Sequence, residues 1–579
     1  MSWRDAYCGE LRAGDVGRTV TLAGWVARRR DHGRLVFIDL RDGEGVCQLV
    51  VNPEHAPDAH AAAHDVRNEF VLQATGDVVR RAPEAVNPNL PTGEVEVQVT
   101  SLDIVSRSTP LPFQLDEENV DETLRLRYRW LDLRRPKLQR NIRLRGQMVG
   151  VIRRVMEDAG FVDIQTPILW KPTPEGARDF LVPARLQPGR FYALPQSPQI
   201  AKQLLVIANF ERYYQIAICF RDEDLRADRV QEITQLDVEM AFPDVDFIHA
   251  LMETMIQAVW RECLGIEVQT PFDRLTFAEA DSRFGSDKPD RRFGLELQDA
   301  TEVTRGSRFA VFADAEAVRF ISVPREFSRA QLQELEAFAQ EWGAKGLAYL
   351  IAGRDGEIRS PIAKFLSEGE LEHVKPPPGS TALFLADTWE MTSRVLGPLR
   401  LHLGETLGLI DEREFDFVWI EEFPMFEWDE HEERWNAQHH PFTRPSPTWE
   451  ERFDRDPRNA TAVAYDLIAN GNEIGGGSIR IHEPEMQARV FDLLQISPAE
   501  QRAKFGFLLD ALATGAPPHG GIAFGIDRMV MVLAHEPNLR DTVAFPKNQA
   551  GVDPMTGAPS EAPQEQLDEL GITLREPPA

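Results

Sequence analysis

One hairpin constrains the fold of this chain more than any other feature. An apolar strand runs from Ala462 to Ala469 and is followed by Asn470-Gly471, a dipeptide that strongly favours a two-residue hairpin turn. A second strand then returns over Asn472 to Ile481. The sequence therefore predicts an antiparallel sheet in the second half of the chain, with a register that the turn sets.

This register places two carboxylates together. With Asn470 and Gly471 in the loop, Ile468 faces Glu473, so Asp466 and Glu473 lie diagonally on the same face. Magnesium prefers a couple of carboxylates completed by substrate phosphate oxygens, so we expect Mg²⁺ and a nucleotide here. The alternative, a solvent-facing acidic hairpin, fits less well because the strand is otherwise apolar.

The glycine run Gly475-Gly476-Gly477 weakens the returning strand and indicates a bulge or the close approach of a ligand. Arg480 depends on that bulge. By strict alternation its side chain points away from Asp466 and Glu473, so it reaches the same site only if the register shifts by one residue.

A second predicted hairpin carries most of its charge on one face. A strand from Tyr213 to Arg221 leads through an acidic and basic loop into a strand that holds Gln235, Asp237 and Glu239 two residues apart. Arg221 suits a phosphate, because its guanidinium can donate two parallel hydrogen bonds. The carboxylates predict either a site for a cationic ligand or an internal salt bridge, and the pattern alone leaves both open.

Residues 1 to 106 read as five short strands separated by turns, which predicts a small barrel of the oligonucleotide-binding (OB) type. The expected strands are Thr19 to Val26, Leu35 to Leu40, Val46 to Val51, Phe70 to Val79 and Val95 to Val105. Basic residues alternate with an aromatic residue from Arg28 to Arg41, around Arg30, His32 and Phe37. This patch predicts either an RNA-binding face or a solvated strand edge with Phe37 in the core.

Length and composition set the wider frame. At 579 residues the chain is long enough for two to four domains, and it has no leader-like or membrane-spanning apolar run, so we expect a cytoplasmic protein. Four widely spaced cysteines indicate reduced thiols. The net charge of −29 argues against a nucleic-acid partner, but residues 125 to 154 hold eleven Lys or Arg against one acidic residue, which predicts local basic patches.

Helical spacing begins after Pro136 and ends at Gly160, and strands alternate with helices to about residue 280 and again from about 420 to 545. The stretch from about 285 to 415 has its own pattern and resembles an insertion. Near the carboxyl end, the segment Gly520 to Arg528 is rich in glycine but matches neither the Walker nor the dinucleotide-binding pattern, so another nucleotide fold is required.

Several strings together resemble the class II aminoacyl-tRNA synthetases, and within them the bacterial aspartyl-tRNA synthetases. Pro167 after a long helix, Phe220-Arg221-Asp222-Glu223 and Gly525-Ile526-Asp527-Arg528 are similar to motifs one, two and three of the class. The narrower resemblance lies in Thr173 to Phe180, Leu194 to Gln199, His439 to Thr443 and Glu473 to Ser478. It covers nearly the whole chain.

The resemblance implies an α+β multidomain protein. Its expected parts are an anticodon-binding OB-fold barrel (residues 1–106), a hinge (107–140), a catalytic domain built on a six-stranded antiparallel sheet (141–284 and 416–579, with a C-terminal extension) and an inserted α/β domain (285–415). It also favours the RNA-binding interpretation of the patch from Arg28 to Arg41, in which Phe37 stacks on a base.

The resemblance also implies roles for individual residues. Arg221 and Arg528 would be catalytic and would hold ATP from two sides, and Asp466 and Glu473 would hold Mg²⁺. The expected ATP-binding residues are Arg221, Asp222, Glu223, Gln231, Glu473, Gly525, Ile526, Asp527 and Arg528. The expected aspartate-binding residues are Glu175, Gln199, Lys202, Arg221, Asp237, His439 and Arg480, and the expected anticodon-binding residues are Arg28, Arg30, His32 and Phe37.

Within this set Glu175 and Asp237 would receive the substrate ammonium, and Lys202 and Arg480 would bind its side-chain carboxylate. Gln199 and Lys202 lie three apart on a helix that we expect to be capped by Ser197, so both can face the pocket. The chain departs from the family at Arg229-Val230-Gln231-Glu232, where Gln-Pro is usual after the arginine, so a glutamine contact to ATP from Gln231 is in question.

The expected reaction joins L-aspartate to tRNA(Asp) at the expense of ATP, in a homodimer. The alternative within the class is a relaxed enzyme that also charges tRNA(Asn). A catalytically dead RNA-binding relative would have lost Arg221, Glu473 or Arg528, and a ligase that amidates a free amino acid would lack the barrel; this sequence keeps all of these features.

Overall fold

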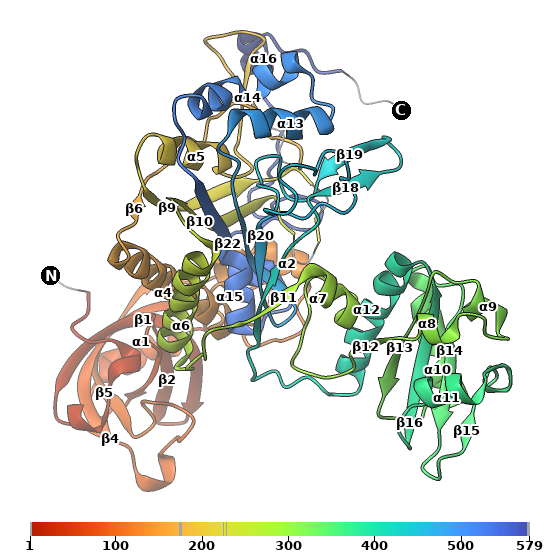
Figure 1. Ribbon diagram of the computed structural model, residues 1–579. Helices are drawn as coiled ribbons and strands as arrows, with labels where there is room; N and C mark the ends of the chain where they lie inside the picture. Colours follow the sequence, from red (N-terminus) through yellow and green to blue (C-terminus); the bar gives the residue numbers. More distant parts are fainter. Residues whose placement is uncertain (1–2, 173–175, 224, 227–228, 576–579) are drawn as a thin grey trace. The chain divides into compact units, whose positions relative to one another are not determined.

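The computed structural model describes residues 3–172, 176–223, 225–226 and 229–575 (Figure 1). The chain divides into two compact units, Met1–Val120 and Asp121–Ala579.

The first unit is a closed five-stranded barrel, as the turn-punctuated sequence predicts. Its strands are β1 (Thr19–His32), β2 (Leu35–Arg41), β3 (Val46–Val51), β4 (Val71–Arg80) and β5 (Val95–Ser106), in the order β1-β2-β3-β5-β4, with helix α1 (Pro57–Asp65) after β3. Alternate side chains such as Val36, Ile38 and Leu40 fill the interior. Strand β1 extends to His32, six residues beyond the expected end, and these residues pair with β2.

The second unit is built on an eight-stranded sheet of order β11-β17-β20-β21-β22-β10-β9-β6. The six central strands are antiparallel, as the resemblance implies, and a short parallel strand is added at each edge. In sheet order the strands are β11 (Asp273–Thr276), β17 (Phe417–Glu421), β20 (Ala464–Ala469), β21 (Asn472–Ile479), β22 (His519–Gly525), β10 (Glu232–Ala241), β9 (Arg212–Phe220) and β6 (Val162–Asp163).

Three helices pack on this sheet and bury its main core: α4 (Pro136–Asp158), α6 (Val245–Leu264) and α15 (Ile526–Ala534). Their apolar stripes supply Met148, Met252 and Met529, which meet sheet residues such as Leu236 and Phe524. Helix α4 ends where the sequence predicts, because Gly160 adopts the left-handed conformation (φ +80°).

Between β11 and β17 the chain forms a separate five-stranded sheet of order β12-β13-β16-β14-β15. These strands are β12 (Leu297–Asp299), β13 (Ala317–Val323), β16 (Ser380–Asp387), β14 (Ala348–Ala352) and β15 (Ile358–Arg359). The helices of this region are α7 (Phe277–Phe284), α8 (Thr301–Thr304), α9 (Ala310–Ala313), α10 (Arg329–Glu341), α11 (Glu368–Val374) and α12 (Trp389–Thr406). This sheet has its own core, so the inserted stretch is an α/β unit.

The remaining elements are short or flank the large sheet. They are α2 (Glu122–Arg127), α3 (Arg129–Asp132), α5 (Gln199–Ile207), α13 (Pro484–Leu493), α14 (Pro498–Leu512), α16 (Gln564–Leu570) and two hairpins, β7 (Leu181–Pro183) with β8 (Phe191–Ala193) and β18 (Phe426–Asp429) with β19 (Arg434–Ala437).

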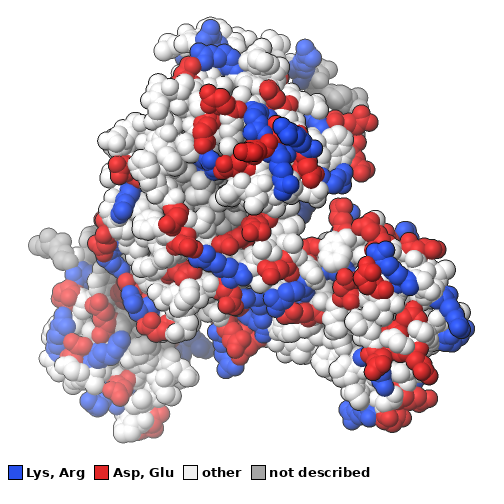
Figure 2. Space-filling view, in the orientation of Figure 1, with Lys and Arg blue, Asp and Glu red and all other residues white. Residues whose placement is uncertain are grey.

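Much of the basic run of residues 125 to 154 is not a free phosphate-binding patch. Arg125 and Arg129 pair with the buried Asp132, and Arg125 also pairs with Asp541. Lys137, Arg140 and Arg145 pair with Glu536, Asp541 or Asp527 of the carboxyl-terminal part. Acidic residues about 400 positions away therefore neutralise this run, and residues 121 to 140 of the expected hinge lie in the second unit. Lys and Arg are interspersed with Asp and Glu on the face shown in Figure 2.

All four cysteines lie in the described part of the chain, and none of them forms a disulfide there. Within the described ranges, no helix has both the length and the apolar character that crossing a bilayer requires.

A buried histidine supports the sheet beside the inserted unit. The ring of His249 in α6 stacks on Trp419 of β17, with centroids 3.8 Å apart and planes 7° apart. Burial lowers the pKa of His249 to about 3, so the ring is neutral near pH 7 and its Nδ1, 3.4 Å from Glu421, forms no ion pair there.

We predict that His249 makes the protein sensitive to mild acid. The unfolded chain takes up a proton at the ordinary pKa of 6.5 whereas the folded chain does not, so the free energy of unfolding falls as pH drops from 6.5 towards 3. The expected loss is about 1.4 kcal/mol per pH unit. Urea unfolding at pH 7.5 and 5.5 measures this effect. Between these two pH values the free energy of unfolding of His249→Phe should fall by about 1.4 kcal/mol less than that of the parent chain.

The exposed His431 provides the control, because His431→Phe should leave the pH dependence unchanged. Equal pH dependence of the parent chain and His249→Phe would contradict the assignment.

Candidate functional site

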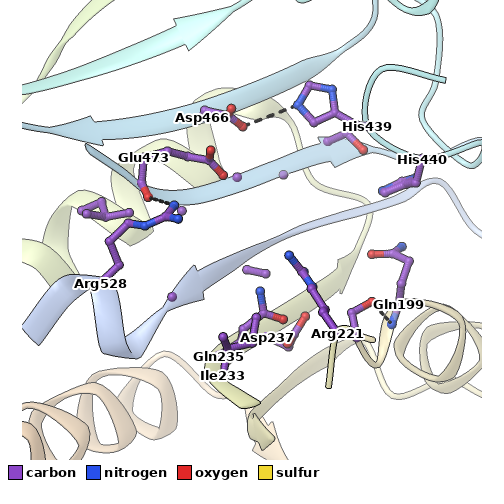
Figure 3. Close-up of a pocket in the computed structure, with 18 of the residues that line it drawn as sticks. Gln199, Arg221, Ile233, Gln235, Asp237, His439, His440, Asp466, Glu473 and Arg528 are labelled. Atoms are coloured by element: carbon purple, nitrogen blue, oxygen red, sulfur yellow. Dashed lines mark hydrogen bonds and ion pairs between the residues drawn. The ribbon is translucent and has the colours of Figure 1, made fainter. Parts of the chain in front are cut away.

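A pocket of about 260 Å³ lies on the large sheet, over the strands that the sequence singles out (Figure 3). Strands β10, β21 and β22 supply its floor, and α5, α15 and the 439–440 loop supply its sides. The residues that carry charge or a hydrogen-bonding group into it include Gln199, Lys202, Arg221, Gln235, Asp237, His439, His440, Asp466, Glu473, Ser478, Arg480, Asp527 and Arg528.

A bulge brings Arg480 into this pocket, as the glycine run predicts. Ile468 pairs with Glu473, which confirms the register read from the Asn-Gly turn, but Leu467 pairs with Gly475. Ile474 is therefore the extra residue, and the strand beyond it is shifted by one position. Asp466 then faces Gly476, and Arg480 lies on the same face as both carboxylates of the hairpin.

The buried charges at one end of the pocket form three ion pairs between different elements. Lys202 Nζ of α5 lies 3.1 Å from Asp237 Oδ1 and 3.4 Å from Glu239 Oε2, and Arg480 donates from Nε and Nη2 to the two oxygens of Glu239 at 3.0 Å. All four side chains are at most 2% exposed. The internal salt bridge, one of the two readings of the carboxylate face, is therefore present, with Lys202 and Arg480 as the cations.

One carboxylate oxygen in this network has no partner. Asp237 Oδ2 is buried and accepts no hydrogen bond from any described residue. Burial raises the pKa of Asp237 despite the neighbouring ammonium of Lys202, whereas for Glu239 the pairing with Arg480 outweighs burial and lowers the pKa. An unpaired buried carboxylate oxygen is costly, so this atom is a candidate acceptor for a cationic group of a ligand.

Arg480 is held by more than Glu239. Its Nη1 lies 2.5 Å from Ser478 Oγ and 2.9 Å from His440 Nε2. Burial, reinforced by the charge of Arg480, lowers the pKa of His440 well below its ordinary value, so the neutral ring accepts this hydrogen bond. Four of the five guanidinium N–H groups are thus assigned among the described residues, and one on Nη2 remains for a ligand.

The hairpin carboxylates form a second charged group. Burial and the charge of Glu473 raise the pKa of Asp466 to about 6. Burial acts on Glu473 too, but Lys288, whose Nζ lies 2.9 Å from Glu473 Oε2, outweighs it and lowers the pKa. His439 Nε2 lies 3.7 Å from Asp466 Oδ1, and this neighbour raises the pKa of His439 against the effect of burial.

These two carboxylates fit an open magnesium site. Asp466 Oδ1 is buried and accepts no hydrogen bond from the described residues. Among those residues no group of three or more His, Cys, Asp and Glu could enclose a metal ion. Two carboxylates with room for phosphate oxygens and water are the ligand set that Mg²⁺ prefers.

Two arginines enter the same pocket from different sides. Arg221 points into it at the end of β9 (Figure 3), and no described residue accepts a hydrogen bond from its guanidinium. Arg528 at the start of α15 donates from Nη1 to the backbone carbonyl of Glu473 at 2.7 Å. Because these two cations line the same pocket as the carboxylate pair, the pocket suits a ligand that carries several negative charges.

Not every residue expected at the nucleotide site lies in the pocket. Gly525, Asp527 and Arg528 line it, but the side chain of Ile526 belongs to the hydrophobic core. Asp222 and Glu223 pair with Arg178 and Arg229 at 3.8 Å in the partly exposed loop. Gln231 lines a separate depression with Arg540 and Phe545. Glu175 lies outside the described residues.

The carboxylate of Asp527 is used within the protein. It accepts from Arg145 of α4 and, at 2.8 Å, from the backbone N–H of Thr234. The expected cap of α5 also differs: the helix begins at Gln199 with Pro198 as its N-cap, and Ser197 Oγ accepts from the Gln199 N–H at 3.2 Å. Gln199 and Lys202 still face the pocket together.

The basic and aromatic patch of the first unit lies on the outer face of the barrel. Arg30 pairs with Phe37 and His32 with Leu35 across β1 and β2, and the rings of His32 and Phe37 meet edge to face at 5.6 Å. Phe37 is half-buried, so the reading that placed it in the core is wrong. Arg28 is exposed, whereas Arg30 is neutralised by Asp39 at 2.7 Å.

Sequence reasoning missed three residues of the site: His440 and Ser478, which line the pocket, and Lys288, which contacts Glu473. Ser478 shares the face of Arg480 once the bulge is included, and His440 adjoins His439, so counting along the chain could have found both. Lys288 is 185 residues from Glu473 in the sequence, so no local pattern predicts their contact.

The fold and the pocket together define an enzyme of the class II synthetase type, and comparison with known proteins agrees. Residues 121–549 match the family model of class II tRNA synthetases (D, K and N), and residues 20–105 match the OB-fold nucleic acid binding domain. This chain therefore belongs to the class II aminoacyl-tRNA synthetases, which are ligases, and the predicted fold class is confirmed.

Similar proteins indicate which branch of this family the chain resembles. The chain is 51% identical to the aspartate–tRNA(Asp/Asn) ligase of Symbiobacterium thermophilum, over 98% of this chain and 99% of the relative, and 49% identical to the protein of the same name from Caldanaerobacter subterraneus, over 99% and 98%. The resemblance to bacterial aspartyl-tRNA synthetases is thus confirmed.

Solved structures share the fold. The asparaginyl-tRNA synthetase of Pyrococcus horikoshii with asparaginyl-adenylate is 19% identical with a TM-score of 0.60, covering 93% of this chain and 97% of that one. The aspartyl-tRNA synthetase of Entamoeba histolytica is 20% identical with a TM-score of 0.58, covering 93% and 90%.

We predict that Gly476→Ala disables the carboxylate pair. A Cβ at this position would lie 2.5 Å from Asp466 Oδ1 and 3.6 Å from Glu473 Oε1, so Asp466 must move. We expect roughly tenfold weaker binding of ATP in the presence of Mg²⁺, measured by calorimetry, because displaced ligands cannot share one ion. The control is Gly369→Ala, since a Cβ there meets no atom within 4 Å. Unchanged Mg²⁺-dependent binding in Gly476→Ala would show that the pair is not the metal site.

Proposed function

We propose that this chain is an aspartate–tRNA ligase that activates L-aspartate with ATP and transfers it to tRNA(Asp). The observation that carries the proposal is the arrangement of charge at one end of the pocket. Two cations, Lys202 and Arg480, and the unpaired oxygen of Asp237 meet there. An amino acid with an acidic side chain offers the complementary groups, one ammonium and a second carboxylate.

In the first step the substrate is positioned by these groups. Its ammonium donates to Asp237 Oδ2, and its side-chain carboxylate accepts from Lys202 and from the remaining N–H of Arg480 Nη2. An α-carboxylate oxygen then attacks the α-phosphorus of ATP, the bond to the bridging oxygen breaks, and pyrophosphate leaves. Arg221 and Arg528 bind the phosphates, so the rate gain comes from positioning and from neutralising charge.

Asp466 and Glu473 are the residues that would hold Mg²⁺, which, when bound, supplies positive charge to the phosphate oxygens. The aspartyl adenylate is then attacked by a ribose hydroxyl of the terminal adenosine of the tRNA. An ester forms, the acyl–phosphate bond breaks and AMP leaves.

Rejection of asparagine follows from the charge balance. Without substrate, Lys202 and Arg480 are balanced by Asp237 and Glu239. Aspartate brings an ammonium to Asp237 and a carboxylate to the two cations, which keeps every charge paired. Asparagine brings the ammonium without the side-chain carboxylate, and leaving a buried cation partly unpaired costs a few kcal/mol.

We predict that Lys202→Met reduces aspartate activation at least a hundredfold while ATP binding changes little, because the substitution removes a partner of the side-chain carboxylate and leaves Arg221 and Arg528 in place. Aspartate-dependent exchange of pyrophosphate into ATP measures the first quantity, and calorimetry with ATP measures the second.

The substitution also leaves Asp237 without its cation, so thermal stability must be followed in parallel. The control is Lys504→Met, which removes an exposed lysine of α14 that pairs with Glu500 at 3.6 Å. Unchanged apparent affinity and turnover for aspartate in a folded Lys202→Met protein would exclude Lys202 as a specificity residue.

For the RNA we propose that the outer face of β1 and β2 binds the anticodon, with Phe37 as a stacking platform and Arg28, Arg30 and His32 beside it. The half-buried ring next to basic side chains supports this role. Charging of tRNA(Asn) as well is the second candidate, and the names of the relatives favour it, since they include both tRNAs.

We predict that His32→Leu changes the ratio of charging efficiencies for tRNA(Asp) and tRNA(Asn) and leaves adenylate formation unaltered. The two anticodons differ only at the third base, and histidine can both stack on a base and hydrogen-bond to its edge, whereas leucine can do neither equally well. Side-by-side aminoacylation of the two purified tRNAs is the measurement. An unchanged ratio would remove His32 from discrimination, and no charging of either tRNA by the parent chain would refute the proposed function.

We also propose a homodimer that forms around Pro167. Apolar side chains near it are exposed, including Val162, Ile168 and Ile218, each between 42% and 52%. A second copy that covered them would remove this apolar surface from water.

A further inference from the structure

The segment that leads from α7 into the inserted sheet, residues 285–296, is fixed against the carboxylate hairpin. A Cβ on Gly471 in the hairpin turn would lie 3.1 Å from the Asp290 side chain. Arg291 donates to both oxygens of Asp416 at 2.9 and 2.7 Å, and to Asp273 at 2.9 Å. These contacts keep the segment within reach of the pocket.

Lys288 extends from this segment to the pocket. Its backbone N–H donates to Ser286 Oγ at 3.0 Å, and its Nζ lies 2.9 Å from Glu473 Oε2. The side chain is about two-fifths exposed, so the ammonium can move while its backbone stays fixed. None of the motif resemblances includes this residue.

The position of this ammonium conflicts with an ion on the hairpin. Lys288 neutralises Glu473, and Asp466 lies on the same face. A divalent cation bound by these carboxylates would repel the ammonium and weaken its pair with Glu473, so Lys288 can leave Glu473 when the metal arrives. The phosphates that accompany the metal could receive it, because a lysine on a flexible stem binds phosphate as a point charge with three donors.

We propose that Lys288 is a phosphate-binding residue for the nucleotide, which pairs with Glu473 while the site is without ligand and transfers to the terminal phosphates of ATP, the future pyrophosphate, when ATP and the metal bind. This inference rests on the proposed function, because it takes ATP as the occupant. It also gives the inserted unit a direct link to the reaction, since the segment that carries Lys288 leads into that unit.

The test compares Lys288→Met with the parent chain, using the full-length protein and three ligands measured by calorimetry: ATP, AMP and inorganic pyrophosphate. We expect ATP and pyrophosphate to bind about tenfold more weakly and AMP to bind as before, because AMP lacks the terminal phosphates. The control is Lys345→Met, which removes a lysine of the inserted unit that pairs with Asp387 at 3.0 Å. Lys288→Arg should recover part of the affinity, since it keeps the charge.

A second measurement on Lys288→Met should show a gain in affinity instead of a loss. Without nucleotide, Mn²⁺ as a probe of the metal site should bind more tightly to Lys288→Met, because the competing ammonium is gone. A role confined to anchoring the segment would weaken all ligands together and lower the melting temperature, so equal losses for AMP and ATP would overturn the proposal. Unchanged affinities for ATP and pyrophosphate would overturn it as well.

The two proposals fail separately. A parent chain that binds pyrophosphate through Lys288 but shows no aspartate-dependent exchange would refute the aspartate ligase and leave the phosphate role of Lys288 intact. A parent chain that exchanges normally, with a Lys288→Met variant of the same pyrophosphate affinity, would refute Lys288 alone.

Discussion

The requirement that buried charges be paired governs the second unit. Asp237 and Glu239 lie on a central strand where water cannot reach them, and a carboxylate in that position is stable only beside a cation. Lys202 of α5 and Arg480, the residue after β21, meet this requirement, and so they fix α5 and the end of β21 against β10. The same pairs leave one oxygen of Asp237 and one N–H of Arg480 without a partner among the described residues, and the proposed function assigns both to the substrate.

The bulge at Ile474 makes this network possible. Without it Arg480 would face the opposite side of the sheet from Glu473, and Glu239 would lose its bidentate partner. The glycines after the bulge have a second consequence, because a Cβ on Gly475 or Gly477 would collide with Phe524 or with the Gly521 carbonyl. On its core face the strand is thus packed too closely for side chains, and on the pocket face Gly476 leaves room beside Asp466.

Local patterns predicted those features that depend on nearby residues. The Asn-Gly turn fixed the pairing of Ile468 with Glu473, alternation placed Gln235, Asp237 and Glu239 on one face, and the misfit of Arg480 indicated the bulge. Local patterns could not predict the contacts between segments that lie far apart in the sequence. The basic run of residues 125 to 154 was read as a free patch because its acidic partners, such as Asp541 and Glu536, lie about 400 residues away. The sequence also predicts the end of β1 too early, at Val26, because pairing with β2 extends the strand to His32.

Lys288 is a further contact that local patterns could not predict, because only the fold brings it to Glu473. The charges at the site come from distant parts of the chain: Lys202 from α5, Asp237 from β10, the hairpin carboxylates from β20 and β21, and Lys288 from the segment before the inserted sheet. A cation that is already paired with a protein carboxylate can bind a ligand without adding an unpaired buried charge. The ligand's anionic group then takes the place of that carboxylate as the partner of the cation. Aspartate can do so at Asp237 and Lys202, and phosphate can do so at Glu473 and Lys288. Under the two proposals the pocket would have two ends that work by the same exchange, and a ligand that lacks the matching charge would leave the original pairs in place.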